Sequence, residues 1–400
     1  MRLNYEVPGV YRQDFFLRPE VGLPTGIPGF VGFADAASYD EKGVVTWGKP
    51  AFNQAVELHR KDDFEGKFRS HQFAADSGSE RLSYLADAVN GFFLNGGARC
   101  YVVFADWQAN LETALSKAID VLGPLNDIDL IAIPDAMAVR LPDGKLDTGA
   151  ITRLQKEMLK HCDEHRGRLA ILDSLPGQTA KAVIQQRATL NAGLSEPVNG
   201  ALYYPWVKIS NDRLVPPCGH VAGVFARSDA RVGVFKAPAN EELLGVLDLE
   251  LPVDNQAQSE LNPQNINCLR ATAGRGIRVW GARTISSDPN WRYVNVRRTV
   301  LTLQRWIDAN MSWANFEPNT PRLWVRIKRE LSSYLNALWQ AGALAGQTPE
   351  QAFYIKCDAE TNPSEVREAG QTVTEIGLAP SAPAEFIVVR VIHHTGVEPR

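Results

Sequence analysis

Two histidines and a glutamate lie at a spacing that could bind a metal ion. The segment HCDEH at residues 161–165 has the form H-x-x-E-H, which on a helix places two imidazoles one turn apart. His161, Glu164 and His165 would then form part of a zinc-dependent hydrolase site. The same segment also fits the last turn of a helix ending just before Gly167, where histidine complements the helix C-terminus. No third ligand is indicated by its spacing, so we favour the second interpretation and keep a metal-dependent hydrolase as the alternative.

Other patterns that could support catalysis are missing or misplaced. The glycines of AGRGIRVWGART precede a strand instead of opening a helix, so they cannot present helix-terminal amides to a phosphate. The sequence has no GxSxG nucleophile elbow. Its five cysteines are an odd number at wide spacing, which argues against a disulfide framework or a CxxC zinc site and predicts reduced core thiols. We therefore predict a protein that is not an enzyme and has no cofactor and no metal.

Charge is unevenly distributed along the chain. The net charge is only -4, yet residues 270–330 carry 12 basic and 4 acidic side chains, and residues 241–260 carry acidic side chains with no lysine or arginine. The basic region could bind nucleic acid, or its charges could be solvated and paired within the monomer. We favour self-complementary contacts between subunits. The candidates for these contacts are Arg275, Arg278, Arg292, Arg298 and Arg305 on one side, and Glu241, Glu242, Asp248 and Glu250 on the other.

The elements that position these residues follow an α/β pattern. A chain of 400 residues allows two or three domains. Between residues 82 and 207, apolar positions at helical spacing alternate with short runs such as CYVVFA and RLAILD, which favours a largely parallel sheet covered by helices. The last third begins with a strand pair, INCLRAT and RGIRVWGART, followed by two long helices that start at Asp288-Pro289 and Thr320-Pro321. We expect these helices to pack on a sheet that AFYIKCD and QTVTEIGLA complete.

Each end of the chain carries a strand-like segment with no local partner. The N-terminal segment contains Tyr5, Val7, Val10 and Tyr11, and the C-terminal one contains Phe386, Ile387, Val388, Val389 and Val391. Unpaired strands either fray or join the sheet of another molecule. Arms exchanged between copies make heterologous contacts, which close into rings or continue as helical arrays. The two ends therefore predict a structural protein that polymerises.

Many blocks of the sequence, in order, resemble contractile tail sheath proteins of tailed phages, phage-like bacteriocins and extracellular contractile injection systems. The early blocks are PGVYRQDF, GIPGFVGFA and YLADAVNGFFLNGGARCYVV. The later and more specific blocks are RGIRVWGARTISSDPNWRYVNVRR, WANFEPNTPRLW, LWQAGALAG, AFYIKCDAETNP and APAEFIVVRV. The resemblance covers nearly the whole chain. The chain has little room for large outer decoration domains, so it resembles the compact sheaths of bacteriocins and injection systems, and the resemblance leaves open whether it serves a phage or a tail-like particle.

The resemblance implies an α/β sheath core with mixed sheets and four segments. These are an N-terminal exchange arm (residues 1–20), an α/β sheath domain (21–265), a C-terminal sheath domain (266–383) and a C-terminal exchange arm (384–400). It also implies hexameric rings stacked helically around an inner tube, and contraction that drives the tube through a target envelope without consuming nucleotide. The implied partners are other copies of the chain, the tube protein, and baseplate and terminator proteins, with no nucleic acid.

The compartment follows from what the sequence lacks. The N-terminus has no basic start followed by an apolar run, and no apolar stretch is long enough to span a bilayer. We expect synthesis in the cytoplasm and no direct membrane insertion. The resemblance adds assembly in a bacterial cytoplasm, followed by incorporation into a virion or into a released or anchored contractile particle.

Overall fold

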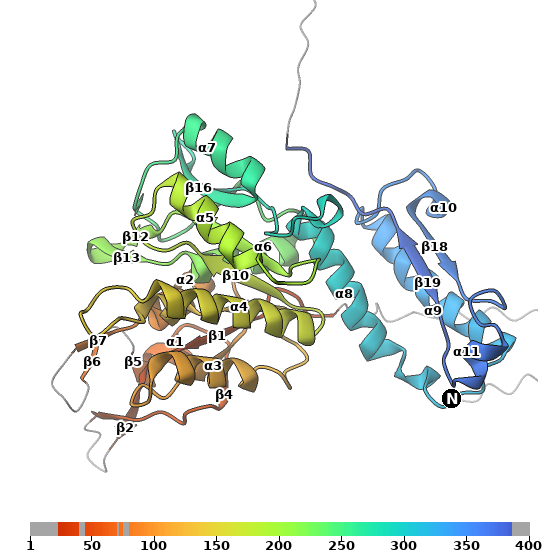
Figure 1. The fold of residues 1–400 in the computed structure, drawn as a ribbon, viewed down its shortest axis with the longest axis horizontal. Helices are drawn as coiled ribbons and strands as arrows, with labels where there is room; N and C mark the ends of the chain where they lie inside the picture. Colours follow the sequence, from red (N-terminus) through yellow and green to blue (C-terminus); the bar gives the residue numbers. More distant parts are fainter. Residues whose placement is uncertain (1–22, 40–44, 70–71, 75–79, 386–400) are drawn as a thin grey trace, which may run out of the picture.

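The structure has two parts joined by one long helix (Figure 1). It is a computed structural model that describes residues 23–39, 45–69, 72–74 and 80–385. A body built on a large sheet precedes α8 (Val294–Asn310), and a smaller C-terminal lobe (residues 311–380) follows it. The strand residues proposed for exchange, from Tyr5 to Tyr11 and from Phe386 to Val391, lie outside the described residues, and of the two predicted arms only Ala384 and Glu385 are described.

The body is organised around one sheet, in which nine strands are found among the described residues. Its six central strands run parallel, and the outer strands β4, β17 and β14 are antiparallel to their neighbours. In order across the sheet the strands are β14 (Glu241–Glu242), β17 (Gly276–Trp280), β16 (Ile266–Thr272), β11 (Gly200–Tyr204), β10 (Leu169–Asp173), β9 (Leu130–Ala132), β1 (Pro28–Gly32), β8 (Cys100–Phe104) and β4 (Ala55–Leu58). The predicted parallel sheet is confirmed.

Helices cover both faces of this sheet because its strands are apolar on both sides. Within β1, Phe30 packs into the core on one face with Phe92 and Phe225, and Val31 packs into the core on the other face with Leu115. In Figure 1 the helices α3, α4 and α5 lie across the near face. The body helices are α1 (Asp62–Glu65), α2 (Leu85–Leu94), α3 (Leu111–Val121), α4 (Thr148–Glu164), α5 (Ala180–Asn191), α6 (Cys218–Arg231) and α7 (Asn255–Leu261).

Short sheets and single turns complete the body. Among the described residues they form the groups β13-β12-β15, β3-β2-β5 and β6-β7. Their bounds are β2 (Asp35–Tyr39), β3 (Val45–Gly48), β5 (Phe68–Arg69), β6 (Gln72–Ala74), β7 (Glu80–Leu82), β12 (Val207–Ile209), β13 (Arg213–Val215) and β15 (Asp248–Leu249).

The C-terminal lobe has its own small core. In this core Trp306 of α8 stacks on Tyr334 of α9 (Pro321–Gln340), with ring centroids 4.2 Å apart. The sheet of the lobe pairs β18 (Phe353–Lys356) with β19 (Glu375–Leu378), and α10 (Pro349–Ala352) and α11 (Ser364–Glu368) complete it. None of the described helices has the length and apolar character needed to cross a membrane.

Two expectations for the last third of the chain were wrong in detail. The strands β16 and β17 pair with each other as predicted, but they belong to the large sheet of the body and do not join β18 and β19. The body therefore continues beyond the predicted boundary at residue 266. Asp288 accepts a hydrogen bond from the Asn290 amide in a 3-10 turn, and α8 starts only at Val294, whereas α9 starts at Pro321 as predicted.

Candidate assembly surfaces

The HCDEH segment lies at the C-terminal end of α4, and its first histidine already has a hydrogen-bond partner within the chain. His161 is buried, and its Nε2 atom lies 2.6 Å from Nη1 of Arg168. Because a guanidinium only donates, the ring nitrogen must accept this bond. Burial, with the neighbouring Arg168 charge, lowers the pKa of His161 to about 3.

Among the described residues, the neighbours of His161 do not complete a metal site. Glu164 forms an ion pair with Lys160, with 3.3 Å between Nζ and the carboxylate. Within the described part of the chain, no three His, Cys, Asp or Glu side chains gather in a way that could hold a metal ion. The geometry therefore gives the hydrolase alternative no support. The five cysteines are buried and unpaired, as predicted.

Arg298 was predicted to reach another subunit, and the structure corrects this. Its side chain is only 2% exposed, with Nη1 2.8 Å from Asp229 Oδ1 and Nη2 2.7 Å from Asp129 Oδ2. Burial alone would lower the pKa of Arg298, but the two carboxylates outweigh it and raise the pKa above its usual value. Arg298 is therefore a structural residue that ties α8 to the body.

The chain enters the body next to this ion pair. Asp129 also accepts hydrogen bonds from the backbone amides of Gly26 (3.1 Å) and Ile27 (2.7 Å). Gly26 has φ +71°, and a Cβ atom on it would lie 2.6 Å from the Cα of Ala226, so only glycine fits here. The residues that follow the N-terminal arm are thus fixed to α6, to β9 and, through Arg298, to α8.

The chain leaves the described structure at a second anchored point. Arg283 forms an ion pair with Glu385, with 2.9 Å between Nε and Oε1, and Nη1 of Arg283 donates to the Asn262 carbonyl. A little earlier, the side-chain amide of Asn295 donates to the Ser381 carbonyl at 2.9 Å. The backbone that follows the N-terminal arm and the backbone that leads into the C-terminal strand segment are therefore both fixed to the body.

The remaining charged candidates differ in whether they already have partners within the chain. Glu241 is buried and pairs with Arg231 and Lys236 of the same chain, so its charge is already compensated. Others are also engaged within the chain: Arg278 donates to the Asn240 carbonyl at 2.6 Å, Glu250 accepts from the Gly177 amide at 2.6 Å, and Arg305 is buried. The other candidates are not buried and form no ion pair with any described residue: Arg275, Arg292, Glu242 and Asp248. These four remain predictions for contacts between subunits.

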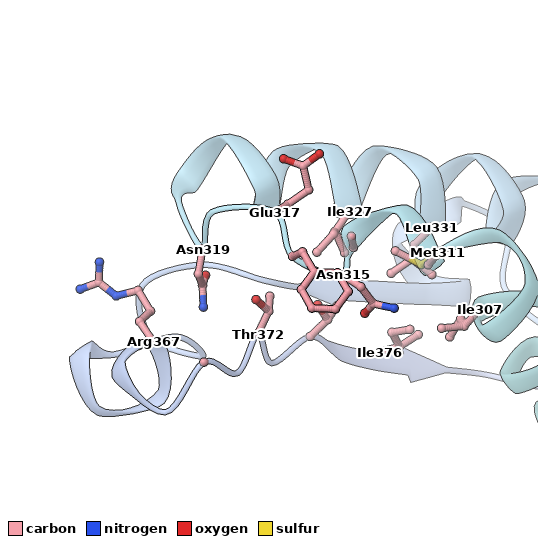
Figure 2. Close-up of a pocket in the computed structure, with 14 residues that line it drawn as sticks. Ile307, Met311, Asn315, Glu317, Asn319, Ile327, Leu331, Arg367, Thr372 and Ile376 are labelled. Carbon is pink, nitrogen blue, oxygen red and sulfur yellow. The ribbon is translucent and has the colours of Figure 1, made fainter.

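The lobe presents a feature that the sequence did not indicate, a groove of about 820 Å³ beside β19 (Figure 2). Thr372, Thr374 and Ile376 alternate along the chain and all line it, together with Ile327 and Leu331 of α9. Among the described strands, β18 and β19 pair only with each other, so each keeps one edge with unpaired backbone groups.

A fully exposed aromatic residue lies at the same groove. Phe316 has a relative exposure of 105% and a positive φ of +67°, a backbone conformation unusual for a bulky side chain. Phe316 therefore adds a solvated apolar side chain to the lining of this groove.

The anchors escaped the sequence analysis because they join distant residues. Arg298 lies 169 residues from Asp129 and 69 from Asp229, and Arg283 lies 102 from Glu385. No local spacing reveals such pairs. The sequence feature that could have suggested a buried arginine was the cluster of arginines on a helix that also carries an apolar stripe.

Comparisons with known proteins give a consistent result. The model of the phage tail sheath protein central domain matches residues 127–285, and the model of the phage tail sheath C-terminal domain matches residues 286–393. A prophage major tail sheath protein of Pseudomonas aeruginosa (strain UCBPP-PA14) is 28% identical over 222 residues, which are 54% of this chain and 55% of that protein. The match thus spans about half the length of this curated relative.

Solved structures match over almost the entire chain. A chain in the cryo-EM structure of the anti-feeding prophage (AFP) baseplate is 30% identical, with a TM-score of 0.72, and the match covers 98% of this chain and 100% of that one. A chain in an extracellular contractile injection system, the PVC sheath complex in its contracted state, is 28% identical, with a TM-score of 0.70 and coverage of 98% and 99%.

Proposed function

Because the chain belongs to the family of phage tail sheath proteins, we propose that it polymerises as hexameric rings stacked helically around an inner tube. The observation that carries this proposal is the match, over nearly the whole chain, to a sheath complex solved in a contracted state. In the proposed cycle the extended sheath is metastable, and a signal from the baseplate lets the subunits repack and drive the tube through a target envelope. The work comes from two packings of the same subunits that differ in free energy.

Exchanged strands would keep the lattice connected while the subunits move. The two open edges of the β18-β19 sheet offer a place for a strand from each of two neighbours. A strand added along β19 would place alternate side chains over the groove lined by Thr372, Thr374 and Ile376. The anchored residues beside each arm support this proposal, because a donated strand transmits force only if its own end is fixed.

Truncation of the arms tests strand exchange. Deletion of residues 1–13, or of residues 386–400, should leave a folded subunit that no longer polymerises, because the arms contribute to assembly more than to the core. A matched control deletes only residues 394–400 and keeps the segment predicted to form the C-terminal strand. Negative-stain electron microscopy of each variant, with tube and baseplate partners present, gives the result. Long tubes from either large deletion would refute strand exchange, and dispersed monomers from the intact chain would refute the sheath function.

A further inference from the structure

The C-terminal lobe carries charges of opposite sign on its long helix and on the segment that follows it. The helix α9 contains four basic side chains and one acidic side chain. Residues 341–380, which include both strands of the lobe, contain six acidic and two basic side chains. The lobe is therefore polarised along its sequence.

The two groups of charges also lie on opposite sides of the lobe, because the lobe is built of two layers. The helix packs on the β18-β19 sheet through a small core that contains Ile327, Leu331, Ile355 and Ile376. These side chains fill the space between the helix and the sheet. The outer side of α9 and the outer side of the sheet consequently point in opposite directions.

The outer side of α9 forms what we call the basic face, which consists of Arg322, Val325, Arg326 and Arg329. Their spacing of three and four residues places them on one side of the helix, and all four are exposed. The Cζ atom of Arg326 lies 3.6 Å from the centre of the Trp313 ring, which positions this guanidinium without neutralising its charge. Arg322 forms no ion pair with any described residue, and Arg329 pairs at 3.1 Å with its neighbour Glu330.

The outer side of the sheet carries an excess of carboxylates. Because strand side chains alternate and Ile355 and Ile376 point towards α9, Lys356 and its cross-strand partner Glu375 point away from it. The hydrogen bond to Glu360 raises the pKa of Lys356, and the charges of Glu360, Asp358 and Glu375 raise it further. One lysine is thus surrounded by three acidic side chains. We call Tyr354, Lys356, Asp358, Glu360 and Glu375 the acidic face.

Each face also presents a large apolar group to solvent. Val325 on the basic face is 62% exposed, and Tyr354 on the acidic face is 59% exposed. The ring of Tyr354 lies over Gly377 on the neighbouring strand, where a Cβ atom would come within 1.9 Å of Cε1 of the ring. An apolar centre with charged groups around it is the usual composition of a protein interface, and tyrosine and arginine are enriched there.

We propose that the basic face of one lobe docks on the acidic face of the lobe of a second copy of the chain. The inference rests on the proposed function, since an assembly is needed to hold the lobes in contact. The charges of the two faces are complementary, and Val325 of one copy would meet Tyr354 of the next. Because the two faces lie on opposite sides of one lobe, the contact is heterologous, and every docked copy offers a free face to another.

This contact is separate from strand exchange. A strand that joins β18 or β19 adds at an edge and extends the sheet in its own plane. The acidic face lies above that plane, because strand side chains stand perpendicular to the sheet. One subunit can therefore use the edges of its small sheet and the two faces of its lobe at the same time.

Cysteine cross-linking in the assembled sheath tests the contact directly. The five native cysteines are buried, so thiols added on the surface react selectively. The full chain with Val325→Cys and Tyr354→Cys, assembled with tube and baseplate partners and treated with a short bis-maleimide, should give a ladder of oligomers on a denaturing gel. The two positions lie on opposite sides of the lobe, so a ladder requires contacts between copies. Each single variant is a control and should give no ladder.

The outcomes separate this contact from the proposed function. Sheaths of the double cysteine variant that yield only monomers or dimers would overturn the inference and leave the proposed function intact. If no sheath forms from the intact chain, the proposed function itself fails, and this inference falls with it.

Reversal of the charges provides a second test. Arg322→Glu with Arg329→Glu makes the basic face net negative, and Glu360→Lys with Glu375→Lys makes the acidic face net positive. Each double variant should raise the protein concentration needed for sheath formation by about tenfold or more, because like charges then oppose each other. An equimolar mixture of the two should restore assembly, since each reversed face then meets an opposite charge on the other variant. Circular dichroism checks that each variant keeps its fold.

A matched control changes the same number of charges elsewhere. Lys117→Glu with Lys181→Glu alters exposed residues of α3 and α5 in the body, and this variant should assemble at the wild-type concentration. Assembly of both reversed variants at the wild-type concentration would contradict the contact. Loss of assembly that the mixture does not restore would show that a different protein covers the two faces, and it would also overturn the inference.

Discussion

Replacing Arg298 with methionine should leave Asp129 and Asp229 buried without a cation. The three side chains are 2%, 4% and 2% exposed, so solvent cannot replace the guanidinium. Removing one partner of a buried ion pair costs roughly 3–5 kcal/mol, because the remaining charges stay desolvated. A domain of this kind has a total stability of about 5–15 kcal/mol, so we expect the variant to fold with much of its free energy of unfolding lost.

Urea unfolding of the full chain, followed by tryptophan fluorescence, measures this loss. It is run at two protein concentrations, because assembly would make the apparent stability depend on concentration. Arg322→Met is the matched control: Arg322 is exposed on α9, and its replacement should change the free energy of unfolding by no more than about 0.5 kcal/mol.

The pH dependence of this loss in free energy of unfolding tests whether the uncompensated carboxylates cause it. In the variant the uncompensated carboxylates gain protons more easily, so the loss should be smaller at about pH 5 than at about pH 7.5. The backbone amides of Gly26 and Ile27 should also exchange hydrogen faster, since Asp129 holds both. A loss below about 1 kcal/mol at neutral pH would refute the assignment of Arg298 as the cation that stabilises this junction.

Two other side chains give independent predictions. Burial lowers the pKa of His220 to about 4, while the unfolded chain titrates near 6.5, so the unfolded state binds more protons in acid and stability is lost as the pH falls. Between about pH 7.5 and 5 this protonation lowers the free energy of unfolding by about 2 kcal/mol. In urea titrations at several pH values, His220→Gln should therefore make the free energy of unfolding fall less steeply with decreasing pH. The same pH dependence in the variant and the wild type would contradict this prediction. Arg283→Met breaks the contact with Glu385 and should cost roughly 1–3 kcal/mol locally, which limited proteolysis detects as faster cleavage after Ser381. Equal cleavage rates in wild type and variant would show that Glu385 is held by something else.

The regular parts of the fold could be predicted because their signals are local. Apolar positions at helical spacing alternate with strand-like runs, and this pattern suffices for the parallel strands between β8 and β11. The turn between β16 and β17 and the start of α9 at Pro321 are likewise set by neighbouring residues. The placement of β16 and β17 could not be predicted, because strand order across a sheet depends on contacts between distant segments.

The charged residues were harder to predict for a physical reason. A count of arginines along α8 treats them all as surface groups, yet Arg298 and Arg305 are buried. Whether a guanidinium is buried depends on carboxylates such as Asp129 and Asp229, which lie far away in the sequence. The HCDEH segment has the same problem, since the spacing shows two histidines on one helix but not the arginine that occupies the first of them.

The shared anchor at Asp129 has a mechanical consequence. One carboxylate holds the incoming backbone at Gly26 and Ile27 and also the guanidinium of Arg298 on α8. Tension on the N-terminal end of the chain therefore acts on the two backbone hydrogen bonds and the ion pair of Asp129 in parallel. These bonds must break together and not one after another. The load passes into the start of β9 and along α8, so a pull on this end of the subunit reaches the large sheet and the helix that joins the two parts without first stretching the small lobe.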